Sequence, residues 1–277
     1  MIKPLFLLAP LMSTQRKQCT RSCNALQKHV SIEERQIHCI FHMPSHTFRL
    51  ISFNIFYALR HGRLSRSVFE HFSELDPDII CLQEVLIGKK RNFARALADA
   101  LDMHVSFSLR REYGKRQIGL AVLSRAPAEE NTAVILPRSS VSRPRIVQIV
   151  QIMHKGAPWR IANTHLSNVS AGARAAQIKA ILSSLNNDRP APIPLVLAGD
   201  FNTKTKKEVT QFGAVLRDAG FAAPETLPYS WRLLGARKKL DWIAAQHCEI
   251  PAIETLPHIK GSDHTPVWAD ISYAPKN

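Results

Sequence analysis

The sequence is short of acidic residues. It holds 22 Asp and Glu against 37 Lys and Arg, which gives a formal charge of +15 at pH 7. Such an excess of positive charge favours polyanionic partners, with nucleic acid as the first choice and anionic membrane surfaces as the second. A basic balance also occurs in proteins that bind no polyanion, so charge alone does not identify the partner.

Cysteine is scarce as well, with five in 277 residues. The five are not spaced as a disulfide framework, which disfavours a stapled secreted scaffold and favours a reducing compartment. We therefore expect a cytoplasmic protein. Secretion would follow only if the apolar start "MIKPLFLLAPLM" acts as a signal, and no small-x-small cleavage site stands behind it.

Long apolar runs are absent, since no stretch approaches the roughly 20 residues that a membrane-spanning helix needs. The chain is nevertheless long enough to bury a large core. Internal repeats and low-complexity segments are absent too. We expect one large monomeric domain with no transmembrane segment.

The first 47 residues have polar and basic stretches and no sustained period, so we expect a disordered basic extension there and a short tail at 274–277. Cysteines and histidines of this extension could be assembled into a zinc site, but their spacing fits no common finger. Met43 is an alternative start, because a strand pattern begins soon after it.

From Phe48 to Tyr273 strand and helix patterns alternate. Five strands in the middle are joined by short turns, which predicts antiparallel pairing. Burying all the apolar faces requires two sheets packed face to face with helices outside, an α/β fold. The predicted strands cover 48–55, 78–85, 104–109, 118–124, 132–136, 145–153, 159–166, 194–200, 239–245, 252–256 and 265–271, and the predicted helices cover 64–75, 93–101, 178–185 and 209–219.

Polar side chains adjoin the ends of several predicted strands, where core packing would prefer Val or Leu. A single unpaired buried carboxylate costs several kcal/mol, so one case would indicate only a cap or a turn. The repeated pattern predicts that these side chains meet in one site. They are Asn54, Glu84, His165, Asp200, Asn202, Asp241, Asp263 and His264.

Their chemistry suits phosphoryl transfer to water. Glu84, Asp200 and Asp263 would repel one another unless a cation lay among them, and hard oxygen ligands favour Mg²⁺ or Mn²⁺. His264 supplies a base near neutral pH, and a carboxylate such as Asp241 can fix its tautomer. Neutral amides can hold a phosphate oxygen. Such a set favours in-line attack by water on phosphorus.

The motifs "LQEV", "NTHL", "GDFN", "KLDWI" and "GSDH" occur in the order and approximate spacing of the endonuclease/exonuclease/phosphatase superfamily, which includes pancreatic deoxyribonuclease and the abasic-site endonucleases. The sequence resembles this superfamily from about Phe48 to Tyr273. The resemblance implies a four-layered α/β sandwich, two packed mixed sheets with helices outside, and a site at one edge of the two sheets.

The resemblance also implies roles. Glu84 and Asp263 would bind the metal. The expected catalytic residues are His165, Asp200, Asn202, Asp241 and His264. Within this set Asp200 would orient or activate the water, and Asn202 would hold a phosphate oxygen. Asp241 and His264 would act together as the general base. The expected substrate-binding residues are Asn54, which would also support Glu84, together with Asn168 and Arg145.

The substrate is left more open than the chemistry. The basic runs "KTKK" and "ARKK" lie beside "GDFN" and "KLDWI", which favours a sequence-nonspecific endo- or exonuclease whose lysines track phosphates. The histidine of "NTHL" argues against a dedicated abasic-site enzyme. A sphingomyelinase-like or other small-phosphoester hydrolase, acting on phospholipid for example, is the alternative. A catalytically inactive nucleic-acid-binding protein is a third reading, although none of the expected residues is missing.

Overall fold

The computed structural model describes residues 46–56, 66–89, 91–139, 143–186 and 193–273. The predicted extension, its hypothetical zinc site, the alternative start at Met43 and the tail at 274–277 lie outside these residues, apart from the last two residues of the predicted extension. No helix in the described part of the chain is both long and apolar enough to cross a membrane.

Seven strands form the first sheet, sheet A, in the order β13-β14-β1-β2-β5-β4, with β3 paired to β2. Every pair is antiparallel except β1 with β2, which are parallel. The strands are β1 (His46–Asn54), β2 (Ile79–Gly88), β3 (Arg91–Asn92), β4 (His104–Tyr113), β5 (Arg116–Ser124), β13 (Glu254–Thr255) and β14 (Val267–Tyr273).

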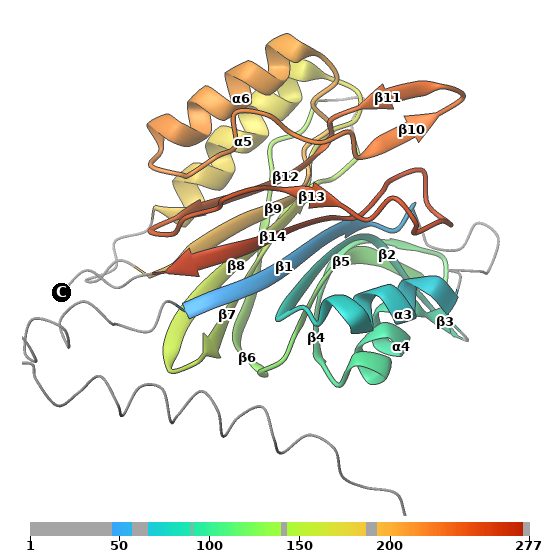
Figure 1. The fold of residues 1–277 in the computed structure, drawn as a ribbon. Helices are drawn as coiled ribbons and strands as arrows, with labels where there is room; N and C mark the ends of the chain where they lie inside the picture. Colours follow the sequence, from blue (N-terminus) through green and yellow to red (C-terminus); the bar gives the residue numbers. More distant parts are fainter. Residues whose placement is uncertain (1–45, 57–65, 90, 140–142, 187–192, 274–277) are drawn as a thin grey trace, which may run out of the picture. The chain divides into compact units, whose positions relative to one another are not determined.

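Five strands form sheet B in the order β12-β9-β8-β7-β6, and here β8 and β9 are the parallel pair. A separate two-stranded hairpin of β10 and β11 projects from the sandwich (Figure 1). The strands are β6 (Ala128–Ile135), β7 (Ile146–His154), β8 (Ala157–His165), β9 (Leu195–Asp200), β10 (Trp231–Leu233), β11 (Ala236–Lys238) and β12 (Asp241–Gln246).

The two sheets pack face to face, and a pair of helices covers the outer face of each (Figure 1). The helices are α3 (Arg66–Leu75), α4 (Phe93–Leu101), α5 (Ala171–Leu185) and α6 (Lys206–Asp218). Phe72 and Leu97 pack α3 and α4 on sheet A, while Ile181 and Leu216 pack α5 and α6 on sheet B. The expected four-layered α/β sandwich of two mixed sheets is confirmed.

Each parallel pair carries a helix in its crossover, α3 between β1 and β2 and α5 between β8 and β9. Two parallel strands end at the same edge of their sheet, so Asn54 closes β1 near Glu84 in β2, and His165 in β8 is in register with Asp200 in β9. Contacts between β1 and β9 and between β2 and β8 bring the two edges together. The fold therefore places four predicted site residues at one edge of the sandwich.

The strand and helix patterns of the sequence match the observed elements closely, and the middle of the chain is antiparallel as expected. Two elements were not predicted: the two-residue β3 and the β10–β11 hairpin. Both are too short to show an apolar period, since only two or three residues of each strand pair.

Candidate active site

Asp200 lies at the centre of the site, at the end of β9. Its Oδ2 accepts a hydrogen bond from Asn54 Nδ2 at 2.9 Å, and its Oδ1 accepts one from the backbone N–H of Asn202 at 2.9 Å. The carboxylate is buried. The first bond joins sheet B to sheet A, and both oxygens of Asp200 are satisfied.

The backbone before Asp200 is adapted to a close approach of β8. Gly199 has φ +141°, and a Cβ there would lie 2.0 Å from the carbonyl oxygen of Thr164. No residue with a side chain fits this position without moving a strand. Asn202, with φ +54°, turns the chain back, and its Nδ2 donates to the carbonyl oxygen of Leu166 at 3.1 Å.

His264 and Asp241 form a directly bonded pair, with 2.8 Å between His264 Nδ1 and Asp241 Oδ2. Asp241 opens β12 and is the register partner of Asp200. The contact fixes Nδ1 as the donor and turns His264 Nε2 toward Asp200 Oδ2, 3.6 Å away. The sequence expectation of an aspartate beside this histidine agrees with the geometry.

The "GSDH" loop is held at the end of β1 by a serine that the sequence analysis did not single out. Ser262 Oγ donates to the carbonyl oxygen of Asn54 at 2.8 Å and accepts from the backbone N–H of His264 at 3.1 Å. The hydroxyl therefore fixes His264 relative to Asn54.

His165 lies between the two carboxylates of different sheets. Its Nε2 is 3.4 Å from Asp200 Oδ2 and its Nδ1 is 3.8 Å from Glu84 Oε1. Burial lowers the pKa of His165 well below its usual value, and the charges of Arg145 and Arg110 act in the same direction. A neutral imidazole at this position can donate a hydrogen bond to a phosphate oxygen.

Glu84 is aimed into the site by a β-bulge. The register of β2 against β5 shifts between Leu82 and Val85, and Glu84 has φ +57°. Its Oε2 is buried and has no hydrogen-bond partner among the described residues. Burial raises the pKa of Glu84; Arg110 and Arg145 oppose that shift, and Asp263 adds to it.

Asp263 shows the same combination of one satisfied and one unsatisfied oxygen. Its Oδ2 accepts from Trp231 Nε1 at 2.8 Å, while its Oδ1 is buried without a partner in the described part of the chain. Two partly buried carboxylates that repel each other, each with one buried oxygen that lacks a partner, fit a hard divalent cation, the role expected of Glu84 and Asp263.

A second acidic group could ligate a cation by distance alone: Asp200, Asp241 and His264 offer atoms within 4.8 Å of one another. Their hydrogen bonds favour another reading. Both oxygens of Asp200 are already bonded, to Asn54 and Asn202, whereas Asp241 is bonded to His264 through Oδ2 and has a buried Oδ1 with no partner among the described residues. Glu84 and Asp263 are therefore the candidate cation ligands.

The charges of the Asp200 and His264 pair are strongly perturbed. Burial raises the pKa of Asp200 to about 7 against the opposing charge of His264. Burial would lower the pKa of His264, but Asp241 and Asp200 outweigh it and raise the pKa to about 10. Both shifts favour the protonated form of the group, with burial as the main cause for Asp200 and the neighbouring carboxylates as the cause for His264.

Arg145 and Asn168 lie together one step out from the centre. Arg145 is buried before β7, and its Nη2 donates to Asn168 Oδ1 at 3.2 Å, whereas Asn168 itself is exposed. Arg110, which the sequence analysis missed, acts on both Glu84 and His165. It lies where the pairing of β4 with β5 shifts register, and such a bulge leaves no periodic signal in the sequence.

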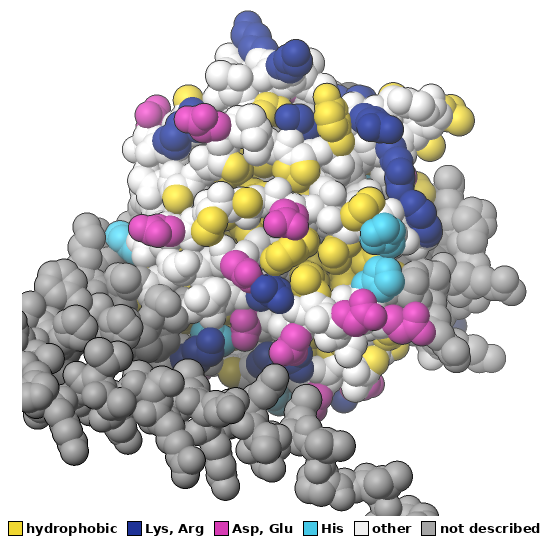
Figure 2. Space-filling model, viewed as in Figure 1, with side chains coloured by type: hydrophobic (Ala, Val, Ile, Leu, Met, Phe, Trp, Pro, Cys, Tyr) yellow, Lys and Arg dark blue, Asp and Glu magenta, His cyan; other side chains and the backbone are white. Residues whose placement is uncertain are grey.

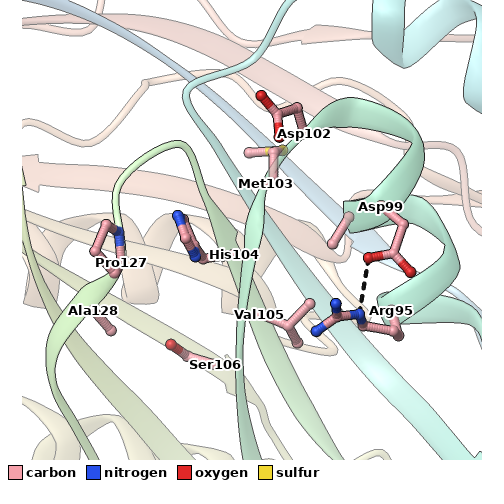
Figure 3. Close-up of a pocket in the computed structure, with 10 residues that line it drawn as sticks. Arg95, Asp99, Asp102, Met103, His104, Val105, Ser106, Pro127 and Ala128 are labelled. Atoms are coloured by element: carbon pink, nitrogen blue, oxygen red, sulfur yellow. Dashed lines mark ion pairs between the residues drawn. The ribbon is translucent and has the colours of Figure 1, made fainter.

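A cavity of about 530 Å³ lies elsewhere, between α4, the start of β4 and the turn before β6. Its charged groups include an ion pair, Arg95 Nε with Asp99 Oδ1 at 2.8 Å (Figure 3). None of the predicted site residues lines it. We place the candidate site at the buried carboxylates and histidines, because those groups have the perturbed charges and orphaned oxygens.

Comparison with known proteins gives one family match. The sequence model of the Endonuclease/Exonuclease/phosphatase family matches residues 51–264. This range holds every predicted site residue, from Asn54 to His264. No curated protein matches the chain.

Solved structures share the fold. An endonuclease/exonuclease/phosphatase from Beutenbergia cavernae DSM 12333 is 20% identical with a TM-score of 0.67, covering 82% of this chain and 72% of its own. D. rerio TDP2 complexed with single strand DNA product is 18% identical with a TM-score of 0.65, covering 82% and 99%. ANGEL2, a 2',3'-cyclic phosphatase, is 16% identical with a TM-score of 0.62, covering 82% and 95%.

Proposed function

We propose, from the premise that this chain belongs to the Endonuclease/Exonuclease/phosphatase family and is a phosphoester hydrolase, that it hydrolyses the phosphodiester bonds of nucleic acid without sequence preference. The observation that carries the proposal is the buried edge of the sandwich. There the Asp200, Asp241 and His264 group lies beside two carboxylates with unsatisfied oxygens.

Glu84 and Asp263 would hold a divalent cation, Mg²⁺ or Mn²⁺ by the hardness of their oxygens. When bound, such a cation stabilises negative charge on a phosphoryl oxygen. Its charge would also lower the pKa of Glu84 and of neighbouring His264, since a nearby positive charge disfavours the protonated forms.

The proton of the attacking water would pass to the Asp200, His264 and Asp241 group. Asp200, with a pKa of about 7, is the member able to accept a proton near neutrality. His264 is held in place by Asp241 and can donate from Nε2 to a phosphate oxygen. His165 and Asn202 would hold further oxygens of the phosphate, and Arg145 with Asn168 would hold the neighbouring part of the substrate.

The choice of nucleic acid is supported by two basic segments that lie beside the site. Lys204 Nζ donates to the carbonyl oxygen of Asn168 at 2.5 Å. Partial burial lowers the pKa of Lys204, and the nearby charges of Arg174 and Lys238 lower it further. The segment "KTKK", which runs into the first turn of α6, and the segment "ARKK", which contains β11, are therefore close enough to repel each other. A phosphate backbone between them would relieve the repulsion. The similarity to a TDP2 structure that contains single strand DNA agrees with this substrate class.

The test begins with bis-p-nitrophenyl phosphate, measured with Mg²⁺, with Mn²⁺ and with EDTA. The proposal expects hydrolysis with either cation and none in EDTA. The same conditions are then applied to plasmid DNA, single-stranded DNA, RNA and sphingomyelin. Full activity in EDTA would contradict the metal dependence. If sphingomyelin were hydrolysed and DNA and RNA were not, nucleic acid would be the wrong substrate class.

A charge series sharpens the substrate assignment. Replacing Lys206, Lys207 and Lys239 by Gln should raise KM for DNA and reduce the slope of log KM against log salt by about one for each lysine that no longer neutralises a phosphate. The matched control replaces Lys155, Lys179 and Arg217 by Gln, three exposed cations away from these segments. The control should leave KM unchanged, and neither variant should change hydrolysis of bis-p-nitrophenyl phosphate.

A further inference from the structure

The β10–β11 hairpin, which we define as Tyr229–Lys239, ends in an apolar tip. Leu233 is 52% exposed and Leu234 is 98% exposed. Figure 1 shows the hairpin projecting from the sandwich, and Figure 2 shows hydrophobic side chains at its tip with Lys and Arg side chains beside them. Large apolar side chains gathered at the end of a projecting element mark a surface that meets a partner.

The backbone of the tip makes leucine an unfavourable choice for the isolated protein. Leu233 pairs with Ala236, so Leu234 and Gly235 form a two-residue turn, and their φ values are +48° and +84°. Positive φ at both positions defines a type I′ turn, for which Asn-Gly is the preferred pair. Leu234 is strained by the left-handed conformation and also exposed to water. Both costs are offset if the side chain enters an apolar phase.

The rest of the hairpin is positively charged. Between Tyr229 and Lys239 the sequence has four basic residues and no acidic one. Arg232 and Arg237 are exposed cross-strand neighbours. The other two cations are lysines that lie against aromatic rings. Lys238 Nζ is 4.9 Å from the centre of the Trp231 ring, and Lys239 Nζ is 5.3 Å from the centre of the Tyr229 ring. The tip is thus backed by a band of cations.

We propose that the β10–β11 hairpin docks this protein on an anionic phospholipid bilayer. Leu233 and Leu234 enter the boundary between headgroups and acyl chains, and the four cations behind them lie at the level of the lipid phosphates. The docking uses the leucines of the tip and not the catalytic groups, although Lys238 and Lys239 of the band also belong to the basic run that the proposed function assigns to nucleic acid.

Other occupants fit the hairpin less well. Single-stranded nucleic acid is bound by stacking on aromatic rings, but one lysine lies over the ring of Trp231 and another over that of Tyr229, and the two leucines at the tip offer no π face. A second copy of the chain would need about 1,200 Å² or more of buried surface, which two leucines on a narrow turn do not offer. A bilayer accepts a narrow apolar tip without a matching pocket.

The hairpin is fixed to the active site, so docking would orient the catalytic edge. Trp231 Nε1 donates to Asp263 Oδ2, and Arg232 N donates to the carbonyl oxygen of Asp263 at 3.1 Å. An isolated β-bridge also joins Trp231 to His264. Insertion of the tip would therefore hold the Asp263 and His264 loop close to the membrane surface.

The experiment is flotation of the full chain with vesicles of phosphatidylcholine alone or mixed with phosphatidylserine, in EDTA so that no substrate is consumed. The wild type should float with the mixed vesicles and not with phosphatidylcholine alone. Leu234→Asn should weaken the partition to mixed vesicles at least about fivefold, because it removes a buried leucine side chain. The variant keeps the hairpin folded, since Asn-Gly is the preferred type I′ pair.

Ile135→Asn is the matched control, because Ile135 is 80% exposed on the edge strand β6, outside the hairpin. It should float like the wild type, and both variants should hydrolyse bis-p-nitrophenyl phosphate at the wild-type rate. The proposal is overturned if the wild type does not bind mixed vesicles, if Leu234→Asn binds them equally well, or if Ile135→Asn loses as much. Weaker binding of an oligonucleotide by Leu234→Asn with unchanged flotation would assign the tip to nucleic acid instead. If the enzyme turns out not to hydrolyse DNA, the flotation results still test the docking of the hairpin.

Discussion

The two sheets contribute unlike halves of one site. On sheet A, Glu84 and Asp263 each have a buried oxygen without a partner among the described residues. On sheet B, both oxygens of Asp200 accept hydrogen bonds. Asp241 of the same sheet is bonded to His264 through Oδ2, and its buried Oδ1 has no partner among the described residues. This difference supports our proposal that an added cation completes the sheet A half and that Asp200 on sheet B accepts the proton of the attacking water. Variants of the two halves should therefore fail in different ways.

The largest effect is expected from Asp200→Asn. Loss of the proton acceptor should lower kcat for bis-p-nitrophenyl phosphate by about 10²–10⁴-fold. Affinity for Mn²⁺, measured by calorimetry, should stay close to that of the wild type, since Asp200 lies in the other half. A large loss of Mn²⁺ affinity would mean that Asp200 belongs to the metal site and that the two halves are not separate.

Glu84→Gln should break the sheet A half instead. The rate at low cation concentration should fall, and raised Mn²⁺ should restore part of it, because a weaker site can still be filled by mass action. Without metal, the free energy of unfolding of the variant should exceed that of the wild type by about 1 kcal/mol, since a largely buried charge is removed. The variant should therefore unfold at a higher urea concentration.

The control for this variant is Glu74→Gln, whose carboxylate is on α3 and exposed. It should change neither rate nor stability. A Glu84→Gln variant with unchanged Mn²⁺ affinity would argue that Asp263 binds the cation without Glu84.

Asn54→Ala tests the hydrogen bond that joins the halves. A positioning partner of this kind is expected to contribute about 10–100-fold to the rate. The bond to Asn54 lowers the pKa of Asp200, so its removal should raise that pKa. The acidic limb of the profile of kcat against pH should then move to higher pH. A lower rate with an unmoved limb would mean that Asn54 acts on the fold and not on Asp200.

The smallest effect concerns the helices outside the two sheets. Arg174 on α5 forms a buried ion pair with Glu208 on α6 and donates to the carbonyl oxygen of Ser167 at 2.9 Å. Burial alone would raise the pKa of Glu208, but the hydrogen bonds from Arg174 and from Lys204 N lower it overall. Stability from this carboxylate is therefore present above the pKa of an unfolded glutamate and is lost as pH falls through the lower, folded value.

Urea unfolding between pH 6 and pH 3 measures how the free energy of unfolding falls with pH. In Glu208→Gln this free energy should depend less on pH. The comparison on sheet A is Asp99→Asn, because the Arg95 and Asp99 pair on α4 is exposed and contributes little. An equal reduction of this pH dependence in both variants would show that the buried pair has no special part in acid sensitivity.

The strands and helices could be read from the sequence because their apolar periods are long. Val267, Ala269 and Ile271 alternate into the core of β14, and Phe93, Leu97 and Leu101 recur on one face of α4. The hairpin could not be predicted in this way, because Trp231–Leu233 is too short to alternate measurably. Its leucine at a type I′ position also contradicts the usual turn signal, which is Asn or Asp before Gly.

The sequence by itself determined which chemical groups this protein brings to its site, since Glu84, Asp200, Asp263 and His264 stand at the ends of strongly patterned strands. Only the tertiary structure decided which groups meet and in what state. Arg110 and Glu84 are turned inward by bulges, and a bulge depends on pairing with a neighbouring strand. The pKa of Asp200 is set by burial and by contacts from residues as distant in the chain as Asn54. Local periodicity records which face of an element is buried, but long-range contacts fix charge and orientation.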